Sequence, residues 1–190
     1  VVNSARADVV QLDATHPGTM YVGFGSGGLW KTVNNGLSWK SIFEDQSGFS
    51  IGDFAIAPSN PNILYLGTGE HLKKPRNYTL PGTGMYRSND AGKTWALLSN
   101  NQDISSRSWY YMKVYADTKN ENIVYVLNAP MMKSIDGGKT FSNVKVGHGD
   151  THDLWIHPKN NNIIGLDKYK DITISNVNMP DTRDLFFEFK

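Results

Sequence analysis

The segment from His148 to Asp153 holds the densest group of side chains that could do chemistry, with the sequence His-Gly-Asp-Thr-His-Asp. On an extended strand His148, Asp150 and His152 would share one face, because side chains alternate between the two faces. Imidazole and carboxylate groups together suit zinc, carboxylates alone suit calcium, and a His–Asp pair can transfer protons. The alternative is that these side chains bond to neighbouring backbone. We rank that structural role first and ligand binding second, and we predict no metal and no cofactor.

Three carboxylates are candidates for catalysis. Glu70, together with Asp53 or Asp153, could form the pair of acids with which glycosidases cleave a glycosidic bond. Such a pair needs a separation of roughly 5 to 10 Å, which spacing along a sequence does not reveal. The alternative, which we favour, is that Glu70 is a buried carboxylate paired with Arg76 or Arg107.

Side chains of this kind need a scaffold, and the chain repeats one short pattern three times. The pattern is Ser/Thr, any residue, Asp/Asn, any residue, Gly, any residue, Ser/Thr, and then Trp/Phe; it occupies residues 32–39, 88–95 and 134–141. In a hairpin turn the Asp or Asn side chain can accept hydrogen bonds from backbone N–H groups, and Gly allows positive φ. Asn34 replaces the carboxylates Asp90 and Asp136, so a neutral acceptor suffices. We call these segments the turn boxes.

A second element precedes each turn box. Residues 13–23, 57–67 and 117–126 share a polar turn followed by an apolar run with a central tyrosine, and residues 157–165 repeat the element without a clear box after it. The interval from Tyr21 to Tyr65 is 44 residues, and the interval from Tyr65 to Tyr125 is 60 residues. Periods of this size, filled with short strands and turns, are typical of propeller blades. No segment has sustained helical periodicity.

The turn boxes resemble the Asp-box repeats, also called BNR repeats, of sialidases, xyloglucanases and sortilin-type propellers. The resemblance is greatest to bacterial secreted or surface proteins with sortilin-like propellers, often labelled glycosyl hydrolase-like, and it extends from about Arg6 to Phe187. It implies an all-β propeller of four-stranded antiparallel blades. It is weak evidence for activity, because these boxes are structural turns in enzymes and non-enzymes alike.

We therefore expect a single propeller portion over residues 1–190, with about four blades at 5–45, 50–100, 107–146 and 150–178 and the start of a further blade at 183–190. The outermost strands are expected at Leu37–Ile42, Thr94–Leu98 and Thr140–Val144, and the fourth blade loses its pattern at Lys168–Asn176. Four blades would leave two bare sheet edges. We favour a portion of a larger ring of seven or more blades, over a ring completed by partner chains.

The family fold also implies which loops face the central channel, namely those between blades and those joining second to third strands. Trp109 and Tyr110, at the entry to an innermost strand, are better candidates for ligand contact than Trp39 and Trp95, which belong to turn boxes and should pack. For Trp109 and Tyr110 too, we rank packing in the core ahead of ligand contact. The candidate ligand-binding residues on this face are Arg76, Arg107, Trp109, Tyr110, His148, Asp150 and His152.

Composition excludes several classes of protein. A formal charge of +1 with 19% charged residues argues against nucleic-acid binding driven by phosphate neutralisation. No apolar stretch approaches the roughly 20 residues of a membrane span. With no cysteine, the chain has no disulfide, thiolate metal site or cysteine nucleophile. The chain opens at Val1 without a signal peptide, so we expect a processed or truncated product.

Two functions remain open. The first is a non-catalytic binding or scaffold propeller that recognises a protein, peptide or carbohydrate on its channel face. The second is a glycoside hydrolase acting on a polysaccharide through Asp53, Glu70 and Asp153. The resemblance implies a secreted, periplasmic or cell-surface protein, and further blades of the same or another chain are expected as partners.

Overall fold

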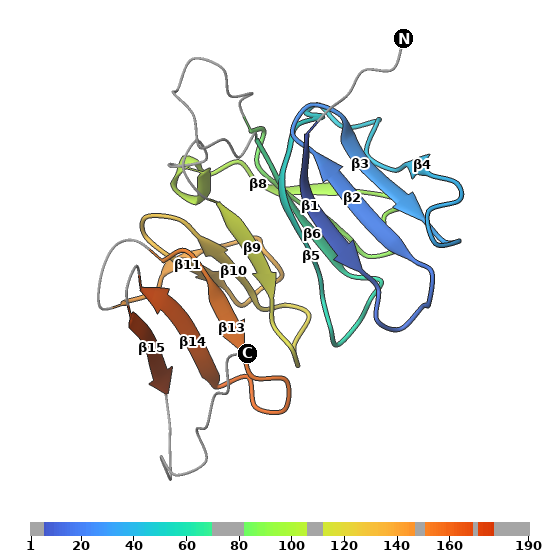
Figure 1. Cartoon of the computed structure of the whole chain (residues 1–190). Coiled ribbons are helices and arrows are strands. Elements are labelled where there is room, and N and C mark those ends of the chain that lie inside the picture. Colours follow the sequence, from blue (N-terminus) through green and yellow to red (C-terminus); the bar gives the residue numbers. More distant parts are fainter. Residues whose placement is uncertain (1–5, 70–81, 106–111, 147–150, 169–170, 177–190) are drawn as a thin grey trace.

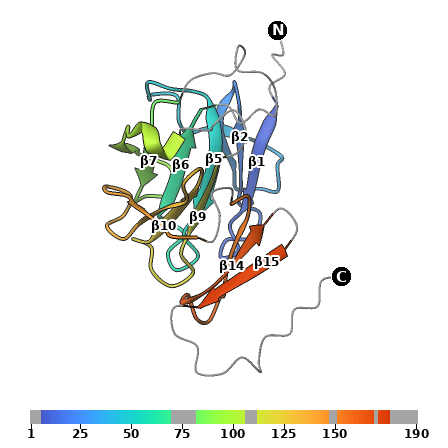
Figure 2. The same ribbon diagram turned by 90° about the vertical axis from the view of Figure 1, so that its left-hand side faces the viewer.

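Four antiparallel β-sheets follow one another along the chain and stand side by side in the computed structural model (Figures 1 and 2). The structure describes residues 6–69, 82–105, 112–146, 151–168 and 171–176. The first two sheets consist, in order, of β1 (Ala7–Leu12), β2 (Met20–Phe24), β3 (Gly28–Thr32) and β4 (Lys40–Ser41), and of β5 (Ile51–Ile56), β6 (Leu64–Thr68), β7 (Met85–Ser88) and β8 (Ala96–Ser99). The other two consist of β9 (Lys113–Ala116), β10 (Val124–Leu127), β11 (Met132–Ser134) and β12 (Ser142–Asn143), and of β13 (Leu154–Ile156), β14 (Ile163–Lys168) and β15 (Asp171–Asn176).

Each sheet is a meander in which successive strands pair, which is the topology of a propeller blade. Apart from a short 3₁₀ turn, η2 (Gln102–Ser105), the described residues contain no helix. None of the described helical residues could therefore span a membrane. The prediction of an all-β protein with four-stranded antiparallel blades is confirmed.

Three apolar cores lie between successive blades and hold them together. Strand β6 shows how one strand serves two cores, because all five of its residues are buried. Its side chains alternate, so Leu64 and Leu66 join the core shared with the first blade, while Tyr65 joins the core shared with the third. Phe54 is 0% exposed, and its ring centroid lies 5.2 Å from that of Tyr21 in the preceding blade. Because the second strand of this blade is buried on both faces, it is apolar at consecutive positions.

Two of the three predicted outermost strands are much shorter than expected, whereas the strand predicted at Thr94–Leu98 is observed as β8. The patterns predicted strands at Leu37–Ile42 and Thr140–Val144, but β4 and β12 contain two residues each. The start of each predicted strand is instead part of the turn, where the backbone of Ser38 or Thr140 donates to the box Asn or Asp. Hydrophobic alternation alone does not reveal that these residues are held in the turn.

The fourth blade also differs from the prediction. Residues Lys168–Asn176 lack the repeat pattern, yet 171–176 form β15, which pairs with β14 from Lys168↔Asp171 to Ile163↔Asn176. A strand can therefore complete the meander without the turn box that marks the other blades. The predicted strand at Asp184–Phe189 lies outside the described residues.

The three turn boxes share one hydrogen-bonding arrangement. In the third box, Ser134 Oγ donates to Asp136 Oδ1 over 2.7 Å and accepts from the backbone N–H of Gly138 over 2.8 Å. Asp136 in turn accepts from the backbone N–H and the hydroxyl of Thr140, over 2.9 and 2.5 Å. The two residues at the apex have positive φ, with 77° at Gly137 and 90° at Gly138. The boxes are thus turns closed by side chains, as the sequence predicted.

Ionisation of the box carboxylates is favoured by these bonds. Partial burial opposes the charged form of Asp90, but the hydrogen bonds from Thr94 and Ser88 outweigh it and lower the pKa of Asp90 to about 2. The hydroxyl and backbone N–H of Thr140, followed by Ser134, hold the pKa of Asp136 well below its usual range. A carboxyl that is more acidic in the folded state stabilises the fold above its unfolded pKa.

Asp136→Ala is therefore expected to destabilise the protein by about 2 kcal/mol at pH 7, because several donors in the third turn lose a charged acceptor. Asp136→Asn should cost less than about 1 kcal/mol, since Asn34 serves the same turn in the first box. Urea unfolding of the two variants checks this. As the pH falls through the depressed pKa of Asp136, the difference between wild type and Asp136→Asn should disappear. Equal losses for the two variants would contradict the assigned role.

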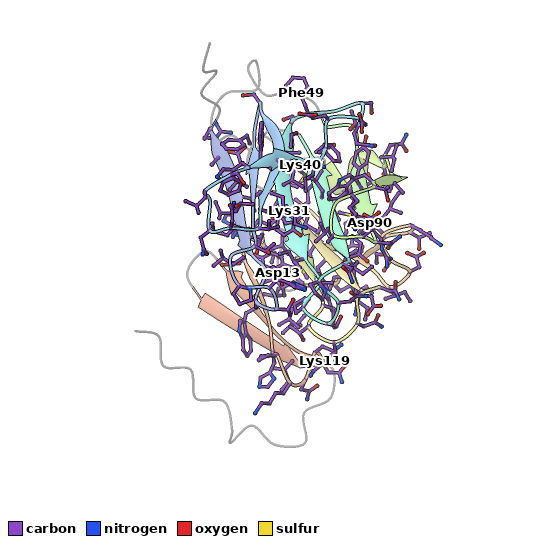
Figure 3. All side chains as sticks on the ribbon, turned by 90° about the vertical axis from the view of Figure 1, so that its right-hand side faces the viewer. Asp13, Lys31, Lys40, Phe49, Asp90 and Lys119 are labelled. Atoms are coloured by element: carbon purple, nitrogen blue, oxygen red, sulfur yellow. The ribbon has the colours of Figure 1, made fainter. Side chains whose placement is uncertain are left out.

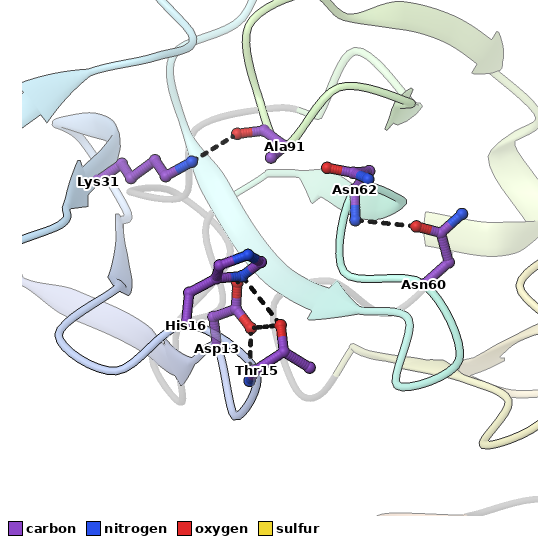
Figure 4. A network of polar contacts seen from close by, with 7 residues as sticks. All are labelled: Asp13, Thr15, His16, Lys31, Asn60, Asn62 and Ala91. Atoms are coloured by element: carbon purple, nitrogen blue, oxygen red, sulfur yellow. Dashed lines mark hydrogen bonds and ion pairs between the residues drawn. The ribbon is translucent and has the colours of Figure 1, made fainter.

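In the first and second blades, a basic side chain on the third strand fastens the blade to the turn box of the next. Lys31 lies opposite Tyr21, with its ammonium nitrogen 5.1 Å from the ring centroid, and Nζ donates to the carbonyl oxygen of Ala91 over 3.1 Å (Figure 4). One blade later, Arg87 stacks on the tyrosine opposite it and donates to the carbonyl oxygen of Gly137 over 3.4 Å. Ala91 and Gly137 occupy the same place in their boxes. We call this contact the seam latch.

One side of the first blade has no blade packed against it among the described residues. Val10 and Leu12 of β1 are 58% and 66% exposed. The matching residue to Val10 is buried in each later blade, with Phe54 at 0% and both Val114 and Leu154 at 4% exposed. This exposure is what a portion of a larger propeller would show.

Candidate functional site

Three of the ten predicted site residues belong to the described part of the chain, namely Asp53, His152 and Asp153. The other seven lie outside the described residues: Glu70, Arg76, Arg107, Trp109, Tyr110, His148 and Asp150. Their predicted roles in catalysis or ligand contact remain predictions. The geometry of the site therefore rests on the two aspartates and on the side chains around them.

Asp53 lies on the first strand of the second blade and bonds to the first strand of the third. Its Oδ2 accepts the backbone N–H of Val114 over 2.7 Å. A register shift between Ile51 and Asp53 marks the same stretch of β5. Burial between the two strands raises the pKa of Asp53 to about 6, and the nearby charge of Asp8 acts in the same direction. Asp53 thus keeps its proton to a higher pH than an ordinary carboxyl.

Asp153 occupies the corresponding place in the fourth blade, directly before β13. Its side chain is 58% exposed and lies 3.4 Å from Lys113 Nζ. Its Oδ1 accepts the hydroxyl of Tyr115 and the backbone N–H of Leu154. Partial burial opposes the charged form, but Tyr115 and Lys113 outweigh it and lower the pKa of Asp153. Asp153 is therefore an ionised carboxylate with a fixed orientation.

Asp53 and Asp153 belong to the second and fourth blades, which lie on either side of the third blade and its first strand, β9. Strand β9 carries both Lys113 and Tyr115, and the charges of Asp53 and Asp153 both help to raise the pKa of Tyr115, after the larger effect of its burial. The positive charge of Lys113 favours the ionised form of both aspartates, but at Asp53 the effect of burial is larger. Burial thus raises the pKa of Asp53, while hydrogen bonds and the charge of Lys113 lower the pKa of Asp153, and glycosidases distinguish their proton donor from its ionised partner by such a difference.

Lys113, Tyr115 and Asp8 were missed as site residues from sequence. A signal was present, because counting along the repeat places Asp53, Lys113 and Asp153 at the same position, directly before Phe54, Val114 and Leu154. Asp8 sits at the start of β1, where it forms an ion pair with Arg6, and its side chain is only 4% exposed. Aligning the repeats by their first strands would have identified these charged residues in the second, third and fourth blades, whereas the first blade has Val9 at this position and Asp8 one residue earlier.

The structure describes only part of the predicted histidine and aspartate cluster at residues 148–153. His152 is half-buried beside Asp153, while His148 and Asp150 lie outside the described residues. Among the residues that the structure does describe, no three His, Cys, Asp or Glu side chains are grouped so that they could hold a metal ion. Ligand contact by the three residues of this cluster remains a prediction.

The tryptophan of the second turn box packs as predicted. Trp95 Nε1 donates to the carbonyl oxygen of Ile42 in the preceding blade over 2.7 Å, and the indole meets Phe43 edge-on with centroids 5.2 Å apart. Trp39 in the first box is 39% exposed. Trp95 is thus part of a seam between blades.

A groove of about 490 Å³ lies on the outer side of the first two blades, away from the two aspartates. It is lined by residues of the first and second turn boxes and of β4, including Lys31 and Lys40, which Figure 3 labels. Of the three predicted site residues that the structure describes, none lines this groove. The groove carries lysines and carboxylates of opposite charge, since Glu44 and Asp45 line it as well.

Asp53→Asn is expected to stabilise the protein at neutral pH. The folded-state pKa of Asp53 is raised to about 6 from 3.8, so the native state binds more protons than the unfolded state between these values. Stability therefore falls as the pH rises from about 4 to 6, and the amide removes this loss while still accepting from Val114. We expect a melting temperature higher by roughly 2 °C or more at pH 7.5 and unchanged at pH 3.5. An equal shift at both pH values would contradict burial of the charge.

Comparison with known proteins identifies the fold and a distant similarity to two enzymes. No family model matches the chain. An oligoxyloglucan-reducing end-specific xyloglucanase from Emericella nidulans is 28% identical over 118 residues, which cover 57% of this chain and 14% of that protein. A probable enzyme of the same name from Neosartorya fischeri is 25% identical over 145 residues, which cover 71% of this chain and 17% of that protein. The chain thus spans less than a fifth of the length of these relatives.

Solved structures agree on the architecture. The crystal structure of an ancestral GH74 enzyme matches with a TM-score of 0.64 at 22% identity, over 85% of this chain and 22% of that one. A chain of the COPII outer coat matches with a TM-score of 0.62 at 14% identity, over 92% of this chain and 47% of that one. Likeness at these identities shows the fold alone. The chain is therefore a β-propeller portion that is similar, over part of their length, to xyloglucanases.

Proposed function

We propose that this chain is part of a glycoside hydrolase propeller that cleaves a β-glucan polysaccharide of the xyloglucan type. The observation that carries the proposal is that Asp53 and Asp153 belong to the blades on either side of β9, where Asp53 bonds to Val114 and has a raised pKa, and Asp153 bonds to Tyr115 and Lys113 and has a lowered pKa. The two xyloglucanase relatives support the substrate class. The proposal thus favours hydrolysis over the binding function that the sequence alone placed first.

In this mechanism Asp53 is the proton donor. Its raised pKa of about 6 keeps it protonated in mildly acidic solution, so that it can protonate the glycosidic oxygen as the bond to the anomeric carbon breaks. The ionised carboxylate of Asp153 either activates the attacking water or attacks the anomeric carbon itself. Water supplies the hydroxyl group of the new reducing end and restores the proton of the acid.

Lys113 and Tyr115 position Asp153 in this scheme. The Tyr115 hydroxyl and the Lys113 ammonium both lie against Asp153 Oδ1, which fixes the carboxylate and keeps it ionised. We further propose that Glu70 is a third carboxylate of the site. The remaining predicted residues would contact the polysaccharide on the channel face: Arg76, Arg107, Trp109, Tyr110, His148, Asp150 and His152.

Further parts of the proposal follow from the family resemblance. We assign the three turn boxes to the Asp-box (BNR) type of the sortilin-like and glycosyl hydrolase-like propellers, on the basis of their shared hydrogen bonds. A polysaccharide substrate of this size is met outside the cytoplasm, so we assign the protein to the secreted, periplasmic or cell-surface space. Further blades complete the ring.

A second candidate is a propeller that binds a polysaccharide without cleaving it. It is favoured by the way the protein already satisfies both aspartates: Asp53 bonds to the backbone of Val114, and Asp153 bonds to Tyr115 and Lys113. Carboxylates held in this way can serve as fixed hydrogen-bond acceptors for sugar hydroxyls. On this alternative the channel face holds the glycan without bond cleavage.

Incubating the full parent protein with xyloglucan distinguishes the two functions. Hydrolysis predicts new reducing ends that accumulate over many turnovers, with a rate that falls above about pH 6 as Asp53 loses its proton. Binding alone predicts retardation of the protein in a gel containing xyloglucan, without new reducing ends. Absence of both results would overturn the proposed substrate class.

A further inference from the structure

We propose that Phe49 is an aromatic platform on which a sugar ring of the polysaccharide stacks, an inference that rests on the proposed function. Phe49 is 59% exposed, more than Trp39 at 39% or Trp155 at 42%, the other exposed aromatic residues in the described part of the chain. Exposed apolar residues are common on protein surfaces, so exposure alone says little. Phe49 is distinguished by the way its backbone is anchored and by its place at the start of an innermost strand.

The backbone at Phe49 is fixed between the first two blades. Its carbonyl oxygen accepts the backbone N–H of Gly28 over 2.9 Å. The next residue, Ser50, is 4% exposed and is bonded on both sides. Its hydroxyl donates to the carbonyl of Gly25 over 2.6 Å, and its carbonyl accepts the N–H of Gly69 over 2.9 Å. The ring of Phe49 thus lies in solvent while the backbone that carries it is anchored. Because this backbone is already ordered, it would lose little conformational entropy on binding.

Phe49 lies on the same edge of the propeller as the start of the innermost strands. Strand β5 begins two residues later at Ile51, and Asp53 follows four residues after Phe49. Figure 3 shows Phe49 at the upper end of the molecule and Asp13, in the loop that follows β1, well below it. The platform and the proton donor thus belong to the same stretch of chain.

The repeat supplies independent support from sequence. Counting along the repeat places Phe49 four residues before Asp53 and Trp109 four residues before Lys113, at the same position in successive blades. Trp109 lies outside the described residues, and nothing in the proposal depends on its structure. An aromatic residue at the entry to two successive innermost strands is what an extended chain of sugar units would use as successive contacts.

The chemistry points to a pyranose ring. One face of a β-linked glucose unit presents C–H groups, which pack against the negative face of an aromatic ring, while its hydroxyl groups remain at the edge for polar partners. A single exposed phenyl ring suits a sugar ring better than it suits an apolar ligand, which would have to be buried. A neutral polysaccharide needs no charged residue at this point.

The inference is tested by binding of xyloglucan to the full parent protein carrying Asp153→Asn, so that the ligand is not consumed. Phe49→Ala is expected to weaken binding roughly five- to thirty-fold, while Phe49→Trp retains or strengthens it. Leu37→Ala is the matched control, since Leu37 is 88% exposed at a turn box and should leave binding unchanged. In the active protein, Phe49→Ala should raise KM with kcat nearly constant, as expected for a contact made equally in substrate and transition state.

Failure of this inference is distinguishable from failure of the proposed function. If the wild type cleaves xyloglucan and Phe49→Ala has an unchanged KM, the platform is wrong and the hydrolase proposal stands. If the wild type binds without cleaving and Phe49→Ala loses binding, the platform stands and the hydrolase proposal is wrong. Equal losses from Phe49→Ala and Leu37→Ala would also overturn the platform, because they would indicate a general effect on the fold.

Discussion

Asp153→Asn is expected to lower kcat for xyloglucan roughly 10²- to 10⁴-fold in the full parent protein, the range that a general acid or base contributes. The amide keeps the shape of the side chain and can still accept the Tyr115 hydroxyl. It cannot, however, activate water or attack carbon. Initial rates of reducing-end formation measure the loss, and a melting curve shows whether the variant remains folded.

The partner residue gives a separate signature. Asp53→Asn removes the proton donor, so cleavage of xyloglucan should fall by a similar factor, and the decline in rate near pH 6 should vanish with it. An aryl glycoside whose leaving group needs no protonation should be cleaved by Asp53→Asn far better than xyloglucan. That rescue should not occur for Asp153→Asn, which acts at the other end of the bond.

Asp103→Asn serves as the control for both variants. Asp103 is an exposed carboxylate in the short helix η2 and carries no part of the proposed mechanism. Its replacement should leave the rate within about two-fold of wild type, since surface substitutions away from a site seldom exceed ±0.5 kcal/mol. Full activity in Asp153→Asn, with reducing ends still released, would show that hydrolysis uses other residues.

Phe54→Ala is expected to destabilise the protein by about 3 to 5 kcal/mol. Phe54 is fully buried in the core shared by the first and second blades, and its ring packs against Tyr21. Alanine would leave a cavity between two blades that are joined by side-chain packing and only a few hydrogen bonds. The midpoint of urea unfolding measures the loss.

The control for Phe54 is an apolar residue that contributes to no core. Ile135 is 71% exposed at the third turn box, and Ile135→Ala should change stability by no more than about 0.5 kcal/mol. Similar losses for Ile135→Ala and Phe54→Ala would show that the seam between the first two blades does not limit stability. A loss confined to Phe54→Ala would show that adjacent blades unfold together.

Most of the fold was predictable from sequence because the blades repeat. In the first three blades the turn boxes fix the position of the third and fourth strands, and the tyrosine of the second strand marks the centre of the blade. The apolar run predicted within residues 13–23, for example, contains the start of β2 at Met20. The outer strands and β15 were less predictable, since β4 is limited by the turn before it. Strand β15 is defined mainly by its pairing with β14, which no local pattern records.

The candidate site was only partly predictable. Asp53 and Asp153 were selected from sequence, but their different acidity was not, because it depends on the backbone of Val114 and on the side chains of Lys113 and Tyr115. These partners come from a strand about 40 to 60 residues away along the chain. Distance along a sequence gives no measure of such contacts, whereas alignment of the repeats places their positions together.

The seam latch has a consequence for how propellers of this kind gain and lose blades. Lys31 and Arg87 bind the same backbone position of the following box, through a carbonyl that any residue supplies. A seam built in this way does not distinguish one blade from another, so a gene that loses the second repeat would still offer Lys31 an acceptor at Gly137. Loss or duplication of a repeat that lies between two others with turn boxes would then leave the latches on either side complete, so blade number can change without new contacts having to arise at the seams.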